Sequence, residues 1–218
     1  MGDNDRWADV HGIRTARTVA RRAMQFAGIG FRAKTARAIA MALTLDETVP
    51  AYLSRWDLVL HDPSDPATSQ PHHSVMELPW ERAISAVQPL ERRIEDVATE
   101  ALEEIIGELR VRGFAISGVG IVGSPDRNLA RIGNAHIRAH AAEGILFRRV
   151  LEVAASNHNL RWRSFSDRRF DEVATVELSP RAPDMKVSLT QIGRAAGKPW
   201  RADERVAATA AWIALKTF

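Results

Sequence analysis

The stretch from Gly133 to Leu151, GNAHIRAHAAEGILFRRVL, has the hydrophobic spacing of a helix that is buried on one side. At about 100° per residue its large apolar side chains share one arc, and three polar side chains lie in the middle of that arc. These three are His136, His140 and Glu143. Because a buried ionisable group is unfavourable without a partner, they predict a functional site in the first turns of the helix.

The composition is that of an ordinary globular protein. The chain has 218 residues, of which 45% are hydrophobic and 26% charged, and this is enough for one sizeable core. The absence of cysteine excludes disulfides and thiolate metal sites and favours a cytoplasmic protein. The sequence has no apolar run that would span a bilayer, and its start, MGDNDRWADV, is unlike a signal peptide, so we expect no membrane association.

The charge is distributed unevenly, although the formal net charge is only +3. Residues 77–108 are acidic, whereas residues 126–169 are rich in arginine. Two explanations fit this polarity: the solvated faces of ordinary helices, and a basic end that meets the phosphates of a nucleic-acid partner. The oligomeric state stays open, with a homo-oligomer among the options.

Residues 1–56 are predicted to form a helical N-terminal extension. Two helices, Ile13 to Phe26 and Ala33 to Leu43, are separated by a turn at Gly28-Ile29-Gly30, and a short helix is expected to end near Trp56. Both long segments carry basic side chains beside apolar ones. A DNA-binding helix-turn-helix and a simple packed helix pair both fit this pattern.

Residues 57–218 are predicted to form an α/β core domain with a mixed sheet covered by helices. Strands are expected at residues 57–61, 72–78, 114–122 and 160–165, and helices at 80–112, 133–151, 187–196 and 201–216. Residues 170–176 are expected to form either a helix or an irregular segment. Ligands of such sheets gather where the strands end and the next helices begin. We therefore expect functional side chains at that edge.

Acidic side chains follow or begin several of these elements. Asp62 follows the first predicted strand, and Asp203 stands in the first turn of the last helix, where helix capping is an alternative role. Together with Glu143 they would offer oxygen ligands suited to Mg²⁺ or Mn²⁺, and such ions support phosphodiester hydrolysis. His136 and His140, one turn apart, alternatively favour zinc, or are structural hydrogen-bonding residues.

Two segments resemble a known family. Residues 58–64, LVLHDPS, resemble the first strand of ribonuclease H-like nucleases of the RuvC resolvase type, in which a hydrophobic strand delivers a metal-binding aspartate. Residues 202–215, ADERVAATAAWIAL, are similar to the last helix of that family. The resemblance implies a ribonuclease H-like fold and a metal-dependent nucleic-acid hydrolase. Its implied metal ligands are Asp62, Glu143 and Asp203, with His140 or His136 orienting a water or leaving group.

The chain departs from that family in two places. The family has an acid near the end of its fourth strand, where this chain has Val122-Gly123-Ser124, and a longer glycine-rich hairpin after its first strand. A noncatalytic module that binds nucleic acid or protein on the same scaffold is therefore the alternative. A third hypothesis is a small-molecule or phosphate-binding enzyme that uses the loop from Gly123 to Arg127.

Basic and aromatic residues give a candidate nucleic-acid surface. Arg127 and Arg131 come from the arginine-rich stretch, and Arg161-Trp162-Arg163 interleaves charge with an aromatic ring. The pattern of the latter three residues favours an outer strand of the sheet, with apolar residues inward and arginines outward, over this nucleic-acid role. The letters of residues 118–123, GVGIVG, match GxGxxG, but they lie inside a predicted strand and so do not predict dinucleotide binding.

Overall fold

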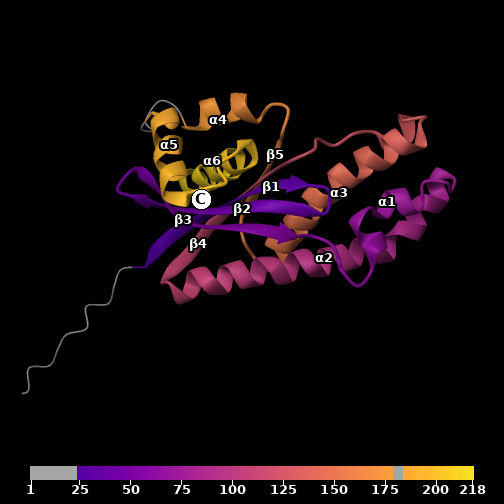
Figure 1. Cartoon of the computed structure of the whole chain (residues 1–218), viewed down its shortest axis with the longest axis horizontal. Coiled ribbons are helices and arrows are strands. Elements are labelled where there is room, and N and C mark those ends of the chain that lie inside the picture. The colour runs from indigo at the N-terminus through magenta and orange to yellow at the C-terminus, as the bar shows by residue number, and fades with distance from the viewer. Residues whose placement is uncertain (1–23, 179–183) are drawn as a thin grey trace, which may run out of the picture.

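A computed structural model describes residues 24–178 and 184–218, which form a five-stranded mixed sheet with helices on both faces (Figure 1). The strands are β1 (Gln25–Lys34), β2 (Arg37–Asp46), β3 (Val49–Val59), β4 (Phe114–Gly123) and β5 (Trp162–Ser166), in the order β3-β2-β1-β4-β5. β1, β2 and β3 pair antiparallel, whereas β4 pairs parallel with β1 and with β5. The predicted α/β class with a mixed sheet is confirmed.

Helices cover the two faces of the sheet with separate cores. On one face lie α2 (Trp80–Val111) and α3 (Ala135–Asn157), and on the other lie α4 (Phe170–Leu178), α5 (Met185–Ala196) and α6 (Ala202–Thr217). Successive side chains of β2 enter the two cores in turn, as the pleat requires. In the parts of the chain that the structure describes, no helix is long and apolar enough to cross a membrane.

Short elements fill the connections. The turn η1 (Pro66–Ser69) and the one-turn helix α1 (Pro71–Ser74) link β3 to α2, and η2 (Leu129–Arg131) lies between β4 and α3. Figure 1 shows α1 beside the first parts of α2 and α3, beyond the ends of the strands. Because α1 lies there, residues of the β3–α2 connection come next to the start of α3.

Glycines on β1 and β4 form a flat surface for α6. Gly30 of β1 lies opposite Gly120 of β4 in the parallel pairing. A methyl group built at Gly30 would lie 2.0 Å from the carbonyl oxygen of Ala207, and one at Gly120 would lie 2.5 Å from that of Ala210. The GxGxxG letters of β4 therefore serve close packing of a helix against the sheet.

Several predictions for the first third of the chain are wrong. Residues 33–43 form the end of β1 and most of β2 rather than a helix, and β3 replaces the short helix before Trp56. Because β3 crosses the predicted boundary between residues 56 and 57, residues 25–56 belong to the sheet. The predicted helix Ile13 to Phe26 lies mostly outside the described residues. The expected strand over 72–78 is also absent, since α1 occupies its start.

The remaining elements agree with the sequence patterns. The predicted strands at 114–122 and 160–165 are β4 and β5, and the four helices predicted from residue 80 onward are present, within a few residues at most ends. Residues 170–176, predicted as either a helix or an irregular segment, belong to the helix α4. The predicted strand at 57–61 is the end of β3, which stops at Val59. These elements place the loops after β4 and β5 at one edge of the sheet.

Candidate metal centre and neighbouring cleft

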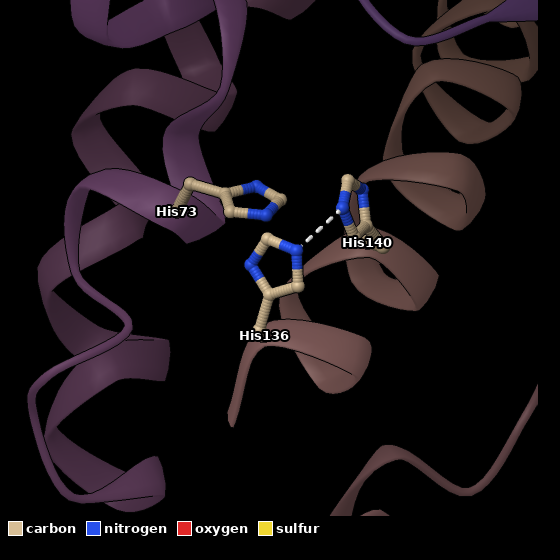
Figure 2. Close-up of side chains that lie close together, drawn as sticks. All are labelled: His73, His136 and His140. Atoms are coloured by element: carbon tan, nitrogen blue, oxygen red, sulfur yellow. Dashed lines mark hydrogen bonds between the residues drawn. The ribbon is translucent and has the colours of Figure 1, made fainter. Parts of the chain in front are cut away.

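Three histidines converge between α1 and the start of α3 (Figure 2). His73 comes from α1, and His136 and His140 come from the first two turns of α3. One ring nitrogen from each lies within 4.8 Å of the others. Among the described residues this is the one group of three or more histidine, aspartate or glutamate side chains with the spacing of a metal site.

Local structure explains why the α3 histidines face the same way. Asn134 caps the helix by accepting a hydrogen bond from the backbone N–H of Ile137 at 2.9 Å, which fixes where α3 begins. Residues four apart then share one helix face, so the His136 and His140 rings lie beside each other, with their Nε2 atoms 3.1 Å apart. Both side chains are exposed to solvent.

A buried carboxylate orients the third histidine. Glu143 is 0% exposed, and its Oε1 lies 2.7 Å from Nδ1 of His73 and accepts a hydrogen bond from the His73 backbone N–H at 3.2 Å. Because a carboxylate accepts, the His73 proton resides on Nδ1 and Nε2 carries the lone pair. Nε2 is buried and has no hydrogen-bond partner among the described residues. This is the tautomer that a metal-binding histidine needs.

The spacing fits a tetrahedral metal ion. With zinc–nitrogen bonds of about 2.0–2.1 Å, tetrahedral geometry sets neighbouring ligand nitrogens about 3.3–3.4 Å apart. The 3.1 Å between the Nε2 atoms of His136 and His140 is close to that value. The ring of His73 has its centroid 5.0 Å from that of His136 and 4.4 Å from that of His140. Three imidazoles are therefore available to one ion.

A cleft of about 290 Å³ adjoins the histidine cluster. It lies beyond the ends of β4 and β5, where the backbone N–H of Asp167 donates to the carbonyl of Gly123 at 2.9 Å. Its walls come from the loop after β4, the first turns of α3 and the turn after β5: Ser124, Pro125, Arg127, Ile137, His140, Ala141, Asp167 and Arg168. His140 belongs to both the cleft and the cluster.

Asp62 lies away from this region in its own hydrogen-bonded turn. Its carboxylate accepts from the backbone N–H and the hydroxyl of Ser64, at 2.8 and 2.7 Å, and from Nε of Arg93 at 2.7 Å. The Ser64 hydrogen bonds, followed by the bond to Arg93, lower the pKa of Asp62 to about 2. The carboxylate therefore ties the turn after β3 to α2.

Asp203 is surrounded by cations. Its carboxylate lies 3.5 Å from Arg32, 3.3 Å from Lys34 and 3.9 Å from Arg37. The predicted capping role belongs instead to its neighbour Glu204, which accepts from the backbone N–H of Arg201 at 2.8 Å. Three positive charges at this distance oppose the approach of a metal dication.

The predicted set of metal ligands is therefore not assembled. Asp62 pairs with Arg93, Glu143 with His73, and Asp203 with the cations near Arg32. The structure brings Glu143 next to the histidines but brings neither aspartate there, and these three acids do not form a group with metal-site spacing in the described part of the chain. The sequence patterns predicted a common site for His136, His140 and Glu143 and did not predict that His73 belongs to it.

The signal for His73 was present but ambiguous. The tandem His72-His73 stands in a loop that also carries acids, which favours a site over a simple connection. Its neighbour His72 is buried and pairs with Glu91 instead, at 3.5 Å. Which of two adjacent histidines meets α3 depends on the direction of the one-turn helix α1, and a sequence pattern does not encode that direction.

The predicted nucleic-acid residues fall into two regions. Arg161 stacks on Phe218, with 4.9 Å between guanidinium and ring, Trp162 donates to Ser156 at 2.9 Å, and Arg163 pairs with Glu177 at 2.8 Å. They sit in or just before β5, which is an edge strand of the sheet. The remaining two, Arg127 and Arg131, follow the end of β4 and are exposed.

Comparison with known proteins finds a likeness of fold. No protein-family model matches the sequence, and no curated protein matches it. The structure of T. thermophilus RuvC in complex with Holliday junction substrate is similar, with a TM-score of 0.47, 10% identity, and 86% of this chain and 91% of that chain covered. Another Thermus thermophilus RuvC structure matches with a TM-score of 0.45, 10% identity and coverage of 86% and 92%.

At 10% identity the likeness concerns the fold alone.

Proposed function

We propose that the protein is a metal-dependent hydrolase whose ion is held by His73, His136 and His140. The observation that carries the proposal is the fully buried Glu143, which holds the Nδ1 proton of His73 and leaves Nε2 of that ring without a partner. A carboxylate that orients a histidine in this way is the usual support of a metal ligand. Nucleic-acid phosphodiesters are the substrates that the sequence predicts.

The donor set favours zinc over the Mg²⁺ or Mn²⁺ predicted from the acids. Imidazole nitrogen suits zinc and its transition-metal neighbours, whereas Mg²⁺ prefers a shell of oxygen atoms. The carboxylate in the cluster, Glu143, is directed to His73 by a 2.7 Å contact and so supports a ligand rather than replacing one. We expect the metal preference to follow the three imidazoles.

A zinc ion held by His73, His136 and His140 would supply a water whose pKa is lowered to about 7. The protein's contribution is positional. Glu143 fixes the His73 ring, while the exposed His136 and His140 leave the solvent side open to a substrate. In the hydrolysis, the water oxygen bonds to phosphorus, the ester P–O bond breaks, and the departing oxygen takes up a proton.

Metal binding is tested by titrating the metal-free protein with zinc, Mn²⁺ and Mg²⁺ in a calorimeter, together with thermal unfolding in each metal. We expect one zinc ion per chain, a raised midpoint, and loss of both in His136→Ala and His140→Ala. Both side chains are exposed, so these variants should fold. His158→Ala is the matched control, because His158 bonds the Thr99 carbonyl at 3.0 Å outside the cluster. Equal zinc binding by all variants contradicts the proposal.

Hydrolysis is tested with the zinc-loaded protein on bis(p-nitrophenyl) phosphate and on single-stranded, duplex and branched DNA and RNA. Turnover that disappears in His140→Ala and persists in His158→Ala supports the hydrolase.

The alternative is a noncatalytic binding module with a zinc ion that only stabilises it. Asp203 favours this alternative, because its carboxylate pairs with Arg32 and is not free to bind a metal ion. Arg32 also lies 3.2 Å from Asp167. Tight zinc binding without turnover on any of these substrates would establish it.

A further inference from the structure

The cleft beside His140 contains two arginines without an acidic partner. Arg127 comes from the loop after β4 and Arg168 from the turn after β5. Within residues 24–178 and 184–218, neither guanidinium makes an ion pair or a hydrogen bond with another side chain. Both side chains are exposed at the cleft, so their charge faces a small volume of about 290 Å³.

The acids next to these arginines are bound by other cations. Asp126, adjacent to Arg127, lies 2.6 Å from Nη2 of Arg148, a side chain that is 9% exposed. Asp167, adjacent to Arg168, lies 3.2 Å from Arg32. Each loop therefore presents an arginine to the cleft, while its neighbouring aspartate pairs with another cation; Asp167 also lines the cleft, but its charge is offset by Arg32. This arrangement leaves a net positive charge at the cleft.

Hydrogen bonds fix the loop after β4 and the turn after β5 in place. Arg148 also donates through Nε to the carbonyl of Ser124 at 2.9 Å and pairs with Glu152. The backbone of Asp167 is tied to the end of β4 through the carbonyl of Gly123. Because both loops are anchored to the same strand end, Arg127 and Arg168 approach the cleft from a fixed scaffold, which limits the entropy lost when they bind an anion.

We propose that this cleft is the phosphate subsite of the enzyme, in which Arg127 and Arg168 bind the phosphate group of a phosphate ester. Guanidinium groups present paired N–H donors that match phosphate oxygens. His140 is common to the cleft and to the histidine cluster, so the bound phosphate lies beside the proposed metal. The inference rests on the proposed function, and it adds that the substrate is a phosphate ester recognised by these two residues.

The subsite is tested in the zinc-loaded protein by calorimetric binding of inorganic phosphate and p-nitrophenyl phosphate. We expect Arg127→Ala and Arg168→Ala each to weaken binding at least tenfold. Arg149→Ala is the matched control, because Arg149 is exposed on α3 but does not line the cleft. Zinc titration of each variant is the second readout, and we expect its affinity to stay within about twofold of the original protein.

The outcomes separate the subsite from the metal centre. The subsite is supported if both cleft variants lose phosphate binding and keep zinc binding, while Arg149→Ala keeps both. Phosphate affinity that is equal in all three variants overturns it, even where zinc binds as proposed. Failure of zinc to bind the original protein overturns the metal centre instead, and phosphate binding by the metal-free protein then still reports on Arg127 and Arg168.

Discussion

Nδ1 of His73 lies 2.7 Å from Oε1 of the fully buried Glu143, and this contact joins the one-turn helix α1 to the inner face of α3. Oε2 of the same carboxylate is buried and has no hydrogen-bond partner among the described residues. Burying a carboxylate costs desolvation free energy, and a carboxylate with one oxygen unpaired recovers only part of that cost. The buried position of Glu143 is explained by the orientation that its carboxylate imposes on the His73 ring.

Glu143→Gln should weaken zinc binding by about 10- to 100-fold, as replacements of carboxylates that support metal ligands do. Glutamine keeps the size of the side chain, so the fold should persist. Calorimetric titration with zinc measures the change. Glu91→Gln is the control, since Glu91 pairs with the neighbouring His72 at 3.5 Å. Equal zinc affinity in both variants would show that Glu143 does not position a metal ligand.

Asp62→Asn should lower stability at neutral pH, with a difference that shrinks in acid. The carboxyl pKa of Asp62 is about 2 in the folded protein, below its ordinary value of 3.8, so folding favours the ionised form. Its contribution is complete above about pH 4 and is lost as the pH falls from 3.8 towards 2. Urea unfolding of both proteins between pH 2 and 7 measures this.

Arg93→Met provides a second test of the Asp62 turn. It removes the 2.7 Å contact to Asp62 but keeps both Ser64 hydrogen bonds. Because those Ser64 bonds are the larger cause of the lowered pKa, this variant should retain part of the acid dependence. If neither substitution changes the dependence of unfolding free energy on pH, Asp62 is not the source of the acid dependence.

Gly120→Ala should destabilise the protein by about 1–3 kcal/mol, because its methyl group would meet the Ala210 carbonyl at 2.5 Å. The nearest atoms are the backbone and Cβ of Ala210, so no flexible side chain is there to move away. Gly107→Ala is the matched control. Gly107 is exposed within α2, where nothing lies within 4 Å of an added methyl group, so the change should stabilise by about 0.5–1 kcal/mol. Chemical unfolding gives both values, and equal effects would contradict the packing role.

Arg32→Met should destabilise by about 1–3 kcal/mol, because it leaves Asp167 and Asp203 without their shared cation. The Arg32 side chain is 12% exposed, so solvent replaces the lost interactions poorly. Adding Asp167→Asn to this variant should recover part of the loss, because it removes the carboxylate that has lost its cation, whereas Asp203 keeps Lys34 at 3.3 Å. A double variant that is less stable by the sum of the two single changes would show that the residues act independently.

The sequence was misleading where a strand contains helix-forming residues. Residues 37–45 of β2, RAIAMALTL, are rich in alanine, leucine and methionine, which favour helix in isolation. Their strand conformation comes from hydrogen bonds to β1 on one side and β3 on the other, and both faces of β2 are covered. Tertiary pairing therefore decided this element, as is common for central strands.

Local patterns determined the elements whose periodicity is strong and the helix face on which His136, His140 and Glu143 stand together. Four-residue spacing fixes such neighbours regardless of the rest of the fold. Tertiary structure alone decided that His73 joins them and that Asp62 and Asp203 turn to Arg93 and the cations near Arg32. These contacts span tens of residues or more, and their geometry depends on how strands, helices and loops pack, which no local spacing records.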